Sequence, residues 1–287
     1  MTFEIVRTVA DLRARVRAWR HAGETIGVVP TMGALHEGHL RLIDAARLRC
    51  TRVIATIFVN PTQFAPSEDF ARYPRREAED AAKLAARGTA LLYAPTLGEI
   101  YPPGFVSEVR VAKLTDHLCG AFRPGHFAGV ATIVTKLLQQ TQPDRAFFGE
   151  KDYQQLQVIK RMVRDLDMPF AIEGVATVRE ASGLAMSSRN EYLTQDQRAA
   201  APQLYRVLCA IANALARGAD IAAQRAWGME ELGRHGFAPI DYLEICDAED
   251  LQPLTEIERP ARVLVAAYLG KTRLIDNVAV AISGLKA

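Results

Sequence analysis

The chain has few cysteines and no pairing pattern among them. Its four cysteines are far apart and none belongs to a CxxC pair; they are Cys50, Cys119, Cys209 and Cys246. Structural zinc sites and the disulfide frameworks of small secreted domains both need closely spaced cysteines. The sequence therefore gives no support to either class, and we expect the four thiols to be reduced.

Long apolar runs and an excess of one charge are also missing. No segment reaches the ~18 apolar residues that a membrane-spanning helix needs. The N-terminal stretch carries charges every few positions instead of the apolar core of a signal peptide. The 35 basic and 33 acidic residues give a formal net charge of +2, with no long run of either sign. We therefore expect a cytoplasmic protein with no membrane or nucleic-acid partner.

The hydrophobic residues are numerous enough for a large core, and their order along the chain predicts an α/β fold. Hydrophobic residues make up 49% of the 287 positions. In the first part of the chain, short apolar runs that suit buried strands alternate with amphipathic stretches that suit helices. This order favours a parallel sheet covered on both faces. We expect its strands at 3–6, 25–29, 51–59, 89–95, 145–148 and 174–180.

Helices are expected between these strands and again in the last third of the chain. The first group covers 8–21, 37–49 and 75–88, a long helix within 122–140 and one from 151, with an irregular loop at 99–106. Thr194 and Gln197 form a capping box that predicts a single helix to Gly218. A helix at 221–235 and strands at 240–246, 262–269 and 273–280 then complete a small α+β domain. We predict two domains, 1–178 and 179–287.

The stretch VPTMGALHEGHL, from Val29 to Leu40, has the pattern of a phosphate-binding turn between a strand and a helix. Gly33 and Gly38 allow the backbone to approach a ligand closely, and a helix start directs N–H groups and partial positive charge at it. His36 and His39 are three residues apart, a spacing that places them on one helix face. There they can donate hydrogen bonds to a breaking phosphoanhydride.

Other interpretations of this stretch remain open. Two histidines and two glycines at a helix start also suit a simple cap with a packed surface pair, and H-x-G-H alone does not decide between them. A zinc site is weaker, because helical zinc ligands usually need i, i+4 spacing or further Cys and His partners nearby.

Four more polar clusters follow predicted strands or turns. Polar residues beyond the carboxyl end of a parallel strand lie where such sheets bind ligands, and Lys, Arg and hydroxyl groups near helix starts suit polyphosphates. Taken singly, each cluster also suits a turn, a solvated first helical turn or a domain linker. The clusters are Asn60 with Gln63, Arg123 with His126, Lys151 with Asp152 and Gln155, and Ser187 with Ser188 and Arg189.

Five stretches taken in order closely resemble the pantothenate synthetase family, the pantoate–β-alanine ligases of coenzyme A biosynthesis. They are PTMGALHEGHL, FVNPTQF, RPGHFAGV, FGEKDYQQLQVI and GLAMSSRN, within about residues 30 to 190. In that family HxGH is similar to the HIGH signature of class I aminoacyl-tRNA synthetases and other nucleotidyl transferases. The SSR segment takes the place of their KMSKS loop.

The resemblance implies a Rossmann-like N-terminal domain, a smaller C-terminal lid domain and a homodimer. It also implies a two-step reaction: pantoate attacks the α-phosphorus of ATP to give pantoyl adenylate and pyrophosphate, and β-alanine then displaces AMP to form pantothenate. Mg²⁺ would assist. A magnesium ion and cationic side chains suit the charge of the transition state and of the pyrophosphate.

The resemblance also assigns residues to substrates. His39 is the usual catalytic assignment, with His36, Lys151 and Arg189 acting beside it on the phosphates. Gln63 and Gln155 would hold pantoate. The ATP site would comprise Met32, Gly33, Ala34, Leu35, His36, Glu37, Gly38, His39, Gly149, Glu150, Lys151, Asp152, Val178, Met186, Ser187, Ser188 and Arg189.

One position departs from the family pattern, and two other functions compete with the ligase. Ser182 stands where the family usually has aspartate, which bears on how the following loop is anchored. A nucleotidyl transferase of the same superfamily would need more cations for a phosphorylated acceptor, and the glutamines weigh against it. A non-catalytic nucleotide- or RNA-binding protein is disfavoured by the near-neutral charge. Pyrophosphate release with pantoate, with a phosphate ester or with neither separates the three.

Overall fold

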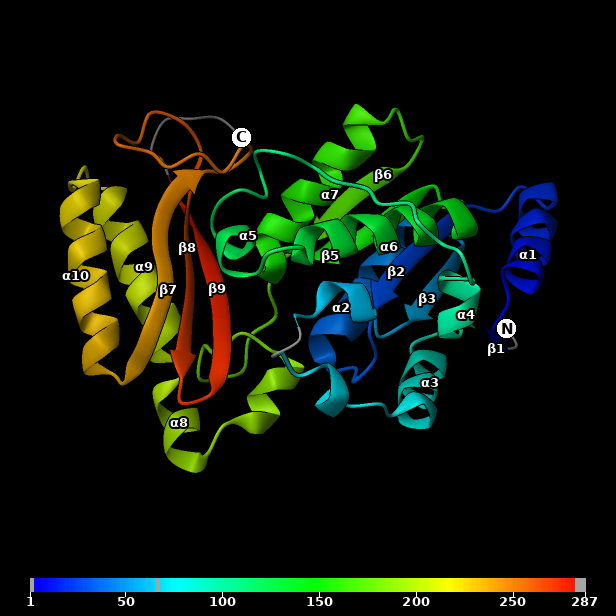
Figure 1. Cartoon of the computed structure of the whole chain (residues 1–287), viewed down its shortest axis with the longest axis horizontal. Coiled ribbons are helices and arrows are strands. Elements are labelled where there is room, and N and C mark those ends of the chain that lie inside the picture. The colour runs from blue at the N-terminus through cyan, green and yellow to red at the C-terminus, as the bar shows by residue number, and fades with distance from the viewer. Residues whose placement is uncertain (1–2, 66–67, 282–287) are drawn as a thin grey trace. The chain divides into compact units, whose positions relative to one another are not determined.

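The structure is a computed structural model that describes residues 3–65 and 68–281 (Figure 1). These residues form two compact units. The first holds the described residues up to Ala112 together with Arg123–Glu150 and Val158–Ala176. The second holds Lys113–Phe122, Lys151–Gln157 and the described residues from Thr177 onward. The chain therefore passes between the units several times.

Among the described residues, the first unit is built on a six-stranded parallel sheet with the order β1-β4-β3-β2-β5-β6. The strands are β1 (Glu4–Val6), β2 (Ile26–Thr31), β3 (Arg52–Ile57), β4 (Leu91–Tyr93), β5 (Arg145–Gly149) and β6 (Ala171–Val175). The helices along this part of the chain are α1 (Val9–His21), α2 (Glu37–Arg49), α3 (Glu77–Ala86), α4 (Leu97–Ile100), α5 (Cys119–Phe122), α6 (His126–Thr141) and α7 (Tyr153–Asp165). The α/β parallel fold expected from the sequence is confirmed.

The strand order reverses between β2 and β5, and the two strands separate there. β2 pairs with β3 along its whole length, from Ile26 to Thr31. Its pairing with β5 is confined to Gly27 and Val28. Pro30, which has no N–H to donate, is tolerated because that edge of β2 has already left β5. The carboxyl ends of β2 and β5 thus open at a topological switch point, the place where open parallel sheets bind ligands.

A buried apolar layer fixes α2 against this sheet. Leu42 and Ile43 of α2 pack with Val29, Ala55 and Phe147 of the three central strands. This layer packs α2 against the sheet, so the first turn of α2 lies at the switch point.

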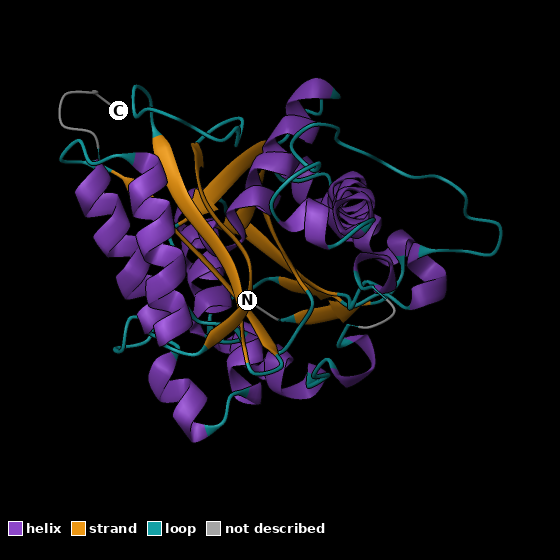
Figure 2. Cartoon of the chain, turned by 60° about the vertical axis from the view of Figure 1, so that its left-hand side comes forward, coloured by secondary structure: helices purple, strands orange, loops and turns teal. Residues whose placement is uncertain are grey.

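The second unit contains a three-stranded antiparallel sheet, β7-β8-β9, and the helices α8 (Gln195–Ala200), α9 (Gln203–Leu215) and α10 (Ile221–Arg234). Its strands are β7 (Phe237–Asp247), β8 (Ala261–Leu269) and β9 (Thr272–Val280). Figure 2 shows α9 and α10 side by side along the sheet. Gly228 permits this packing, because a Cβ there would come within 2.6 Å of both Ile211 and Leu243.

Three sequence expectations about secondary structure are wrong. The last strand of the first sheet is β6, at 171–175, and not 174–180. Residues 178–186 instead form a small hairpin closed by an antiparallel bridge between Arg179 and Ala185. The expected loop at 99–106 begins with the end of α4. The single helix expected from Thr194 to Gly218 is two helices, α8 and α9, because Pro202 has no N–H to continue the ladder.

Two further observations complete the fold. The capping box of Thr194 and Gln197 at the start of α8 is confirmed. Within 3–65 and 68–281, no helix is both long and apolar enough to cross a membrane.

Candidate active site

His36 and His39 are held together by the backbone of the α2 start. His36 is the N-cap of α2, with its own φ of −121° and ψ of 176°, so the expectation that both lie on a helical face is wrong in detail. The N–H of His36 donates to His39 Nδ1 at 3.3 Å, and the N–H of Gly38 donates to His36 Nδ1 at 3.1 Å. The ring centroids lie 4.1 Å apart. The reciprocal cap therefore brings the two imidazoles side by side.

These hydrogen bonds also set the tautomer of both rings. Because each Nδ1 accepts a backbone N–H, the proton of the neutral imidazole resides on Nε2. His36 and His39 thus each carry an Nε2–H donor beyond the carboxyl end of β2. Two such donors suit an anion in which charge builds up during a reaction.

A buried carboxylate from α3, which no sequence pattern signalled, shapes the loop before these histidines. Asp80 is 1% exposed, and its two oxygens accept the N–H groups of Ala34 and Leu35, both at 2.8 Å. Lys83 donates to the Leu35 carbonyl at 2.8 Å. Gly33 has a φ of +83°, and a Cβ there would lie 3.1 Å from Asp80 Oδ2. Asp80 and Lys83 therefore clamp the loop from one side.

This clamp corrects the expectation that unpaired N–H groups of the loop face a ligand. The N–H groups of Ala34 and Leu35 bond to Asp80, and that of Gly38 bonds to the His36 ring. Arg87 Nη2 donates hydrogen bonds to the two carboxylate oxygens of Glu37, at 2.6 and 2.8 Å. These three N–H groups of the loop are therefore bonded within the protein.

Gln63 lies beside the same loop, after β3. It belongs to the 3-10 helix η1 (Pro61–Gln63), and its Nε2 donates to Met32 Sδ at 3.1 Å. Asn60 donates to Gln63 Oε1 at 3.1 Å and to the Gly129 carbonyl at 3.2 Å. Met32 and Gln63, both expected at the site, are thus brought together.

Asn60 itself supports the site without lining it. It is 1% exposed, and its Oδ1 accepts the hydroxyls of Thr62 at 3.0 Å and Tyr101 at 2.8 Å. Burial raises the pKa of Tyr101, so this hydroxyl stays protonated and donates. The geometry therefore does not support the expectation that Asn60 contacts a substrate, because both polar atoms of its side chain bond within the protein.

Arg123 and His126, at the start of α6, hold the backbone of η1 from the other side. His126 Nδ1 lies 2.8 Å from the Gln63 carbonyl, and Arg123 Nη2 donates to the same oxygen at 3.3 Å. Arg123 also forms a bidentate pair with Glu68, at 2.7 and 2.6 Å. Gly129 lets α6 pass close to η1, since a Cβ there would lie 2.4 Å from the Thr62 carbonyl oxygen.

The remaining expected site residues divide between the two units. Gly149 ends β5 at the switch point, and Glu150 begins the 3-10 helix η3 (Glu150–Asp152); both belong to the first unit. The residues of the second unit are Lys151, Asp152, Gln155, Val178, Met186, Ser187, Ser188 and Arg189. Within the second unit, Lys151 Nζ lies 4.0 Å from Asp152 Oδ2, so the pair expected from the sequence is present.

The segment from Val178 to Arg189 is a hairpin followed by a short helix. Val178 accepts the N–H of Met186 at 2.9 Å, which closes the hairpin. The Ser187 hydroxyl accepts the N–H of Arg189 at 3.3 Å and caps the 3-10 helix η4 (Ser188–Tyr192). At the tip, Ser182 Oγ accepts the N–H of Leu184 at 3.3 Å. Because an aspartate makes the same i to i+2 turn bond, Ser182 keeps the turn that the usual residue would form.

The parallel sheet, its switch point and the imidazole pair define an α/β enzyme of the kind that binds an anionic ligand beyond the strand ends. The family model described as pantoate-beta-alanine ligase matches residues 4–279. The chain belongs to this family, and the resemblance drawn from the sequence is confirmed. It is a ligase that forms pantothenate from pantoate and β-alanine.

Individual relatives match over nearly the whole chain. A pantothenate synthetase of Paramagnetospirillum magneticum is 57% identical over 96% of this chain and 97% of its own length. A pantothenate synthetase of Rhodospirillum rubrum is 53% identical over 96% of this chain and 98% of its own length. The crystal structure of a pantothenate synthetase from Thermus thermophilus has a TM-score of 0.91 at 48% identity, covering 96% of this chain and 99% of that one. A pantoate-beta-alanine ligase from Francisella tularensis, complexed with beta-gamma ATP and beta-alanine, has a TM-score of 0.82 at 34% identity, covering 97% and 98%.

Proposed function

We propose that this ATP-dependent ligase works through a pantoyl adenylate. The pantoate carboxylate attacks the α-phosphorus of ATP and pyrophosphate leaves; the β-alanine amine then attacks the acyl carbon and AMP leaves. The observation that carries this proposal is the pair of Nε2–H donors on His36 and His39 at the switch point. The complex of the Francisella tularensis relative with an ATP compound and beta-alanine supports the choice of these two ligands.

The first step asks the protein for position and charge, with no activated nucleophile. A carboxylate is already ionised near neutral pH. What limits its attack is holding two anions together and stabilising the charge that grows on the phosphate oxygens. His39, assisted by His36, donates to those oxygens, and the Asp80 clamp fixes where the two rings stand.

Residues of the second unit serve the polyphosphate and the adenine. Lys151 and Arg189 supply positive charge, Ser187 and Ser188 supply hydroxyl donors, and the backbone at Val178 faces the adenine. The Ser187 hydroxyl is already an acceptor for Arg189 N–H, which leaves its own proton to donate. We propose that this unit acts as a lid that closes over the bound nucleotide.

Gln63 and Gln155 hold pantoate. The state of Gln63 supports this role, because its Nε2 donates to a methionine sulfur, a weak acceptor, at 3.1 Å. A hydroxyl or carboxylate oxygen of pantoate is a better acceptor, so the exchange favours the substrate. Gln155, in the first turn of α7, is half-buried within the second unit.

Mg²⁺ fits this site as an ion carried by the nucleotide. Magnesium commonly binds through substrate phosphates and one or two carboxylates, keeping several waters. Across 3–65 and 68–281, no group of three or more His, Cys, Asp or Glu residues could enclose a metal ion. Asp152, about half exposed and beside Lys151, is the residue that would approach the ion. When bound, the ion neutralises charge on the phosphates.

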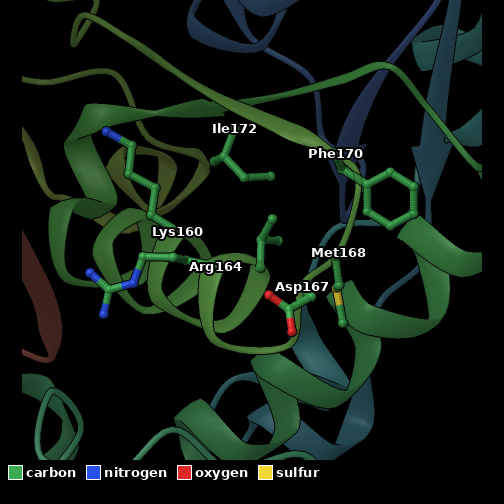
Figure 3. Close-up of a pocket in the computed structure, with 7 residues that line it drawn as sticks. Lys160, Arg164, Asp167, Met168, Phe170 and Ile172 are labelled. Atoms are coloured by element: carbon green, nitrogen blue, oxygen red, sulfur yellow. The ribbon is translucent and has the colours of Figure 1, made fainter.

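We also propose a cytoplasmic homodimer. In the described part of the chain, β6 pairs with β5 alone, so its outer edge is a template for pairing with another chain. A surface hollow beside this strand is lined by apolar and charged residues together (Figure 3); it is formed by Lys160, Val163, Arg164, Asp167, Met168, Phe170 and Ile172. Light scattering should give the mass of two chains; the mass of one would overturn the dimer.

A pyrophosphate-release assay tests the proposed reaction. Purified protein receives ATP with pantoate, with a phosphate ester, or with no acceptor, and each with or without β-alanine. Release should require pantoate and no β-alanine, and AMP should follow only when β-alanine is added. Pyrophosphate release that depends on the phosphate ester would favour a nucleotidyl transferase. Release that needs β-alanine would show that pantoyl adenylate does not form before β-alanine binds.

A further inference from the structure

We propose that Asp276 and Asn277, neighbours on β9, are positioning residues that fix the two phosphate-binding segments of the second unit against one strand. These segments are the hairpin that leads to Ser187–Arg189 and the turn that carries Lys151. The inference rests on the proposed function for the roles of those segments. It adds two residues that touch no substrate themselves.

Asp276 holds the stem of the hairpin through Arg179. The Asp276 side chain is 2% exposed, and its oxygens accept Arg179 Nη1 at 2.6 Å and Nη2 at 2.9 Å. The same guanidinium donates to the Gly183 carbonyl at 3.2 Å and stacks on the Tyr205 ring at 3.6 Å. Arg179 is also the residue that bridges to Ala185 across the hairpin. One buried carboxylate thus fixes both strands of the hairpin.

Asn277 holds the segment that carries Lys151. Its Nδ2 donates to the Lys151 carbonyl at 2.9 Å, and its Oδ1 accepts Arg262. Arg262 in turn stacks on the Tyr153 ring at 3.7 Å, and the Tyr153 hydroxyl donates to the Ala248 carbonyl at 2.8 Å. The side-chain amide of Asn277 therefore fixes the position of the Lys151 backbone relative to β9.

The two attachments start from successive residues of one strand, whose side chains project to opposite faces of the sheet. β9 is the edge strand of the sheet β7-β8-β9. Asp276 directs its carboxylate at the hairpin stem, and Asn277 directs its amide at the Lys151 turn. The backbone N–H of Asn277 also donates to Asp276 Oδ1 at 2.7 Å, which ties the Asp276 carboxylate to the backbone of its neighbour. A shift of β9 would move both phosphate-binding segments together.

The test uses two size-matched variants and one control. Asn277→Asp keeps an oxygen for Arg262 but places a carboxylate oxygen against the Lys151 carbonyl. Asp276→Asn keeps the volume and removes the charge that faces Arg179. Asp241→Asn is the control, because Asp241 pairs with Arg273 at 2.7 Å in the same sheet and lies outside both attachments.

Two partial reactions are measured. Pyrophosphate release from ATP and pantoate should fall at least about tenfold in both variants, because phosphate donors are displaced in the transition state. Amide formation from saturating synthetic pantoyl adenylate and β-alanine involves no pyrophosphate, so its kcat should stay within about twofold of wild type, and so should KM for pantoate. The control should leave both reactions near wild type. An equal loss in both reactions, or no loss in the first, would overturn the proposal.

Hydrogen exchange separates a failure of this inference from a failure of the proposed function. In ligand-free protein, Asp276→Asn should raise exchange at 179–186, and Asn277→Asp should raise it at 151–154. Unchanged exchange at these segments would overturn the attachment whatever the activity. If wild-type protein released no pyrophosphate with pantoate, the proposed function would fall while the exchange result still decided the attachment.

Discussion

The N–H of His36 donates to Nδ1 of His39 at 3.3 Å, so the backbone at one histidine sets the ring of the other. In the neutral imidazole of His39 the proton therefore resides on Nε2. A lysine or arginine could supply positive charge here but could not form this reciprocal cap. The two histidines are therefore interdependent, and removing one disturbs the other.

His39→Ala should lower adenylate formation at least about 10²-fold, the scale of losing one transition-state hydrogen-bond donor. The loss of its ring also frees the His36 N–H, which adds to the effect. The measurement is pyrophosphate release under single-turnover conditions. His21→Ala, on the exposed last turn of α1, is the matched control. Near-normal release from well-folded His39→Ala protein would remove His39 from the mechanism.

Gln63→Ala and Gln155→Ala should each weaken pantoate binding about tenfold while ATP binding stays within about twofold, because tenfold corresponds to a lost hydrogen bond of about 1.4 kcal/mol. Calorimetric titration with each substrate gives both affinities. The exposed Gln195 supplies the control variant Gln195→Ala. Equal loss of ATP affinity would show that these amides serve the nucleotide instead.

Asp80→Asn should lower kcat for adenylation about tenfold or more, because the new amide nitrogen faces a backbone N–H that a carboxylate oxygen accepted at 2.8 Å. One of the two hydrogen bonds of the clamp is lost, yet the volume is unchanged. Glu79→Gln, exposed on the same helix turn, should leave kcat unaltered. If both variants retained wild-type kcat, the loop would not need its clamp.

The sequence predicts a structural feature when the residues that produce it are close together in the chain. The strand, turn and helix around His36 follow from neighbours in the chain, and so does the capping box of Thr194. The Asp80 clamp does not, because Asp80 lies 46 and 45 residues along the chain from Ala34 and Leu35. The role of Asn60 could not be predicted either, because a polar residue after a strand looks the same in sequence whether it lines a site or is buried beneath it. The break at Pro202 could have been read from its missing N–H.

Glu68→Gln should destabilise the protein at neutral pH by about 1.5–3 kcal/mol, the range for hydrogen bonds to charged groups. Burial alone would raise the pKa of Glu68, but the hydrogen bonds and charge of Arg123 outweigh it and lower the pKa. The carboxylate therefore stabilises the fold above its unfolded pKa, and this contribution is lost as pH falls through the folded value. Denaturant titrations should show the wild type and variant converging at acidic pH. A difference that persists there would refute the assignment to charge.

The final prediction concerns Ser182, where the family usually has aspartate. Ser182→Asp should leave adenylation within about twofold of wild type, because aspartate makes the same bond to the Leu184 N–H at the hairpin tip. Ser182→Ala should lose that bond, 3.3 Å long in the native chain, and raise hydrogen exchange at 182–186. Exchange is measured with and without a non-hydrolysable ATP analogue plus pantoate. Protection of 182–190 by the ligands in wild type would support closure of this segment over the phosphates, and Arg189→Ala should then slow adenylation more than it weakens ATP binding. Equal exchange in the free and bound protein would leave the lid without support, and a large loss of activity in Ser182→Asp would show that serine does more at this tip than complete a turn.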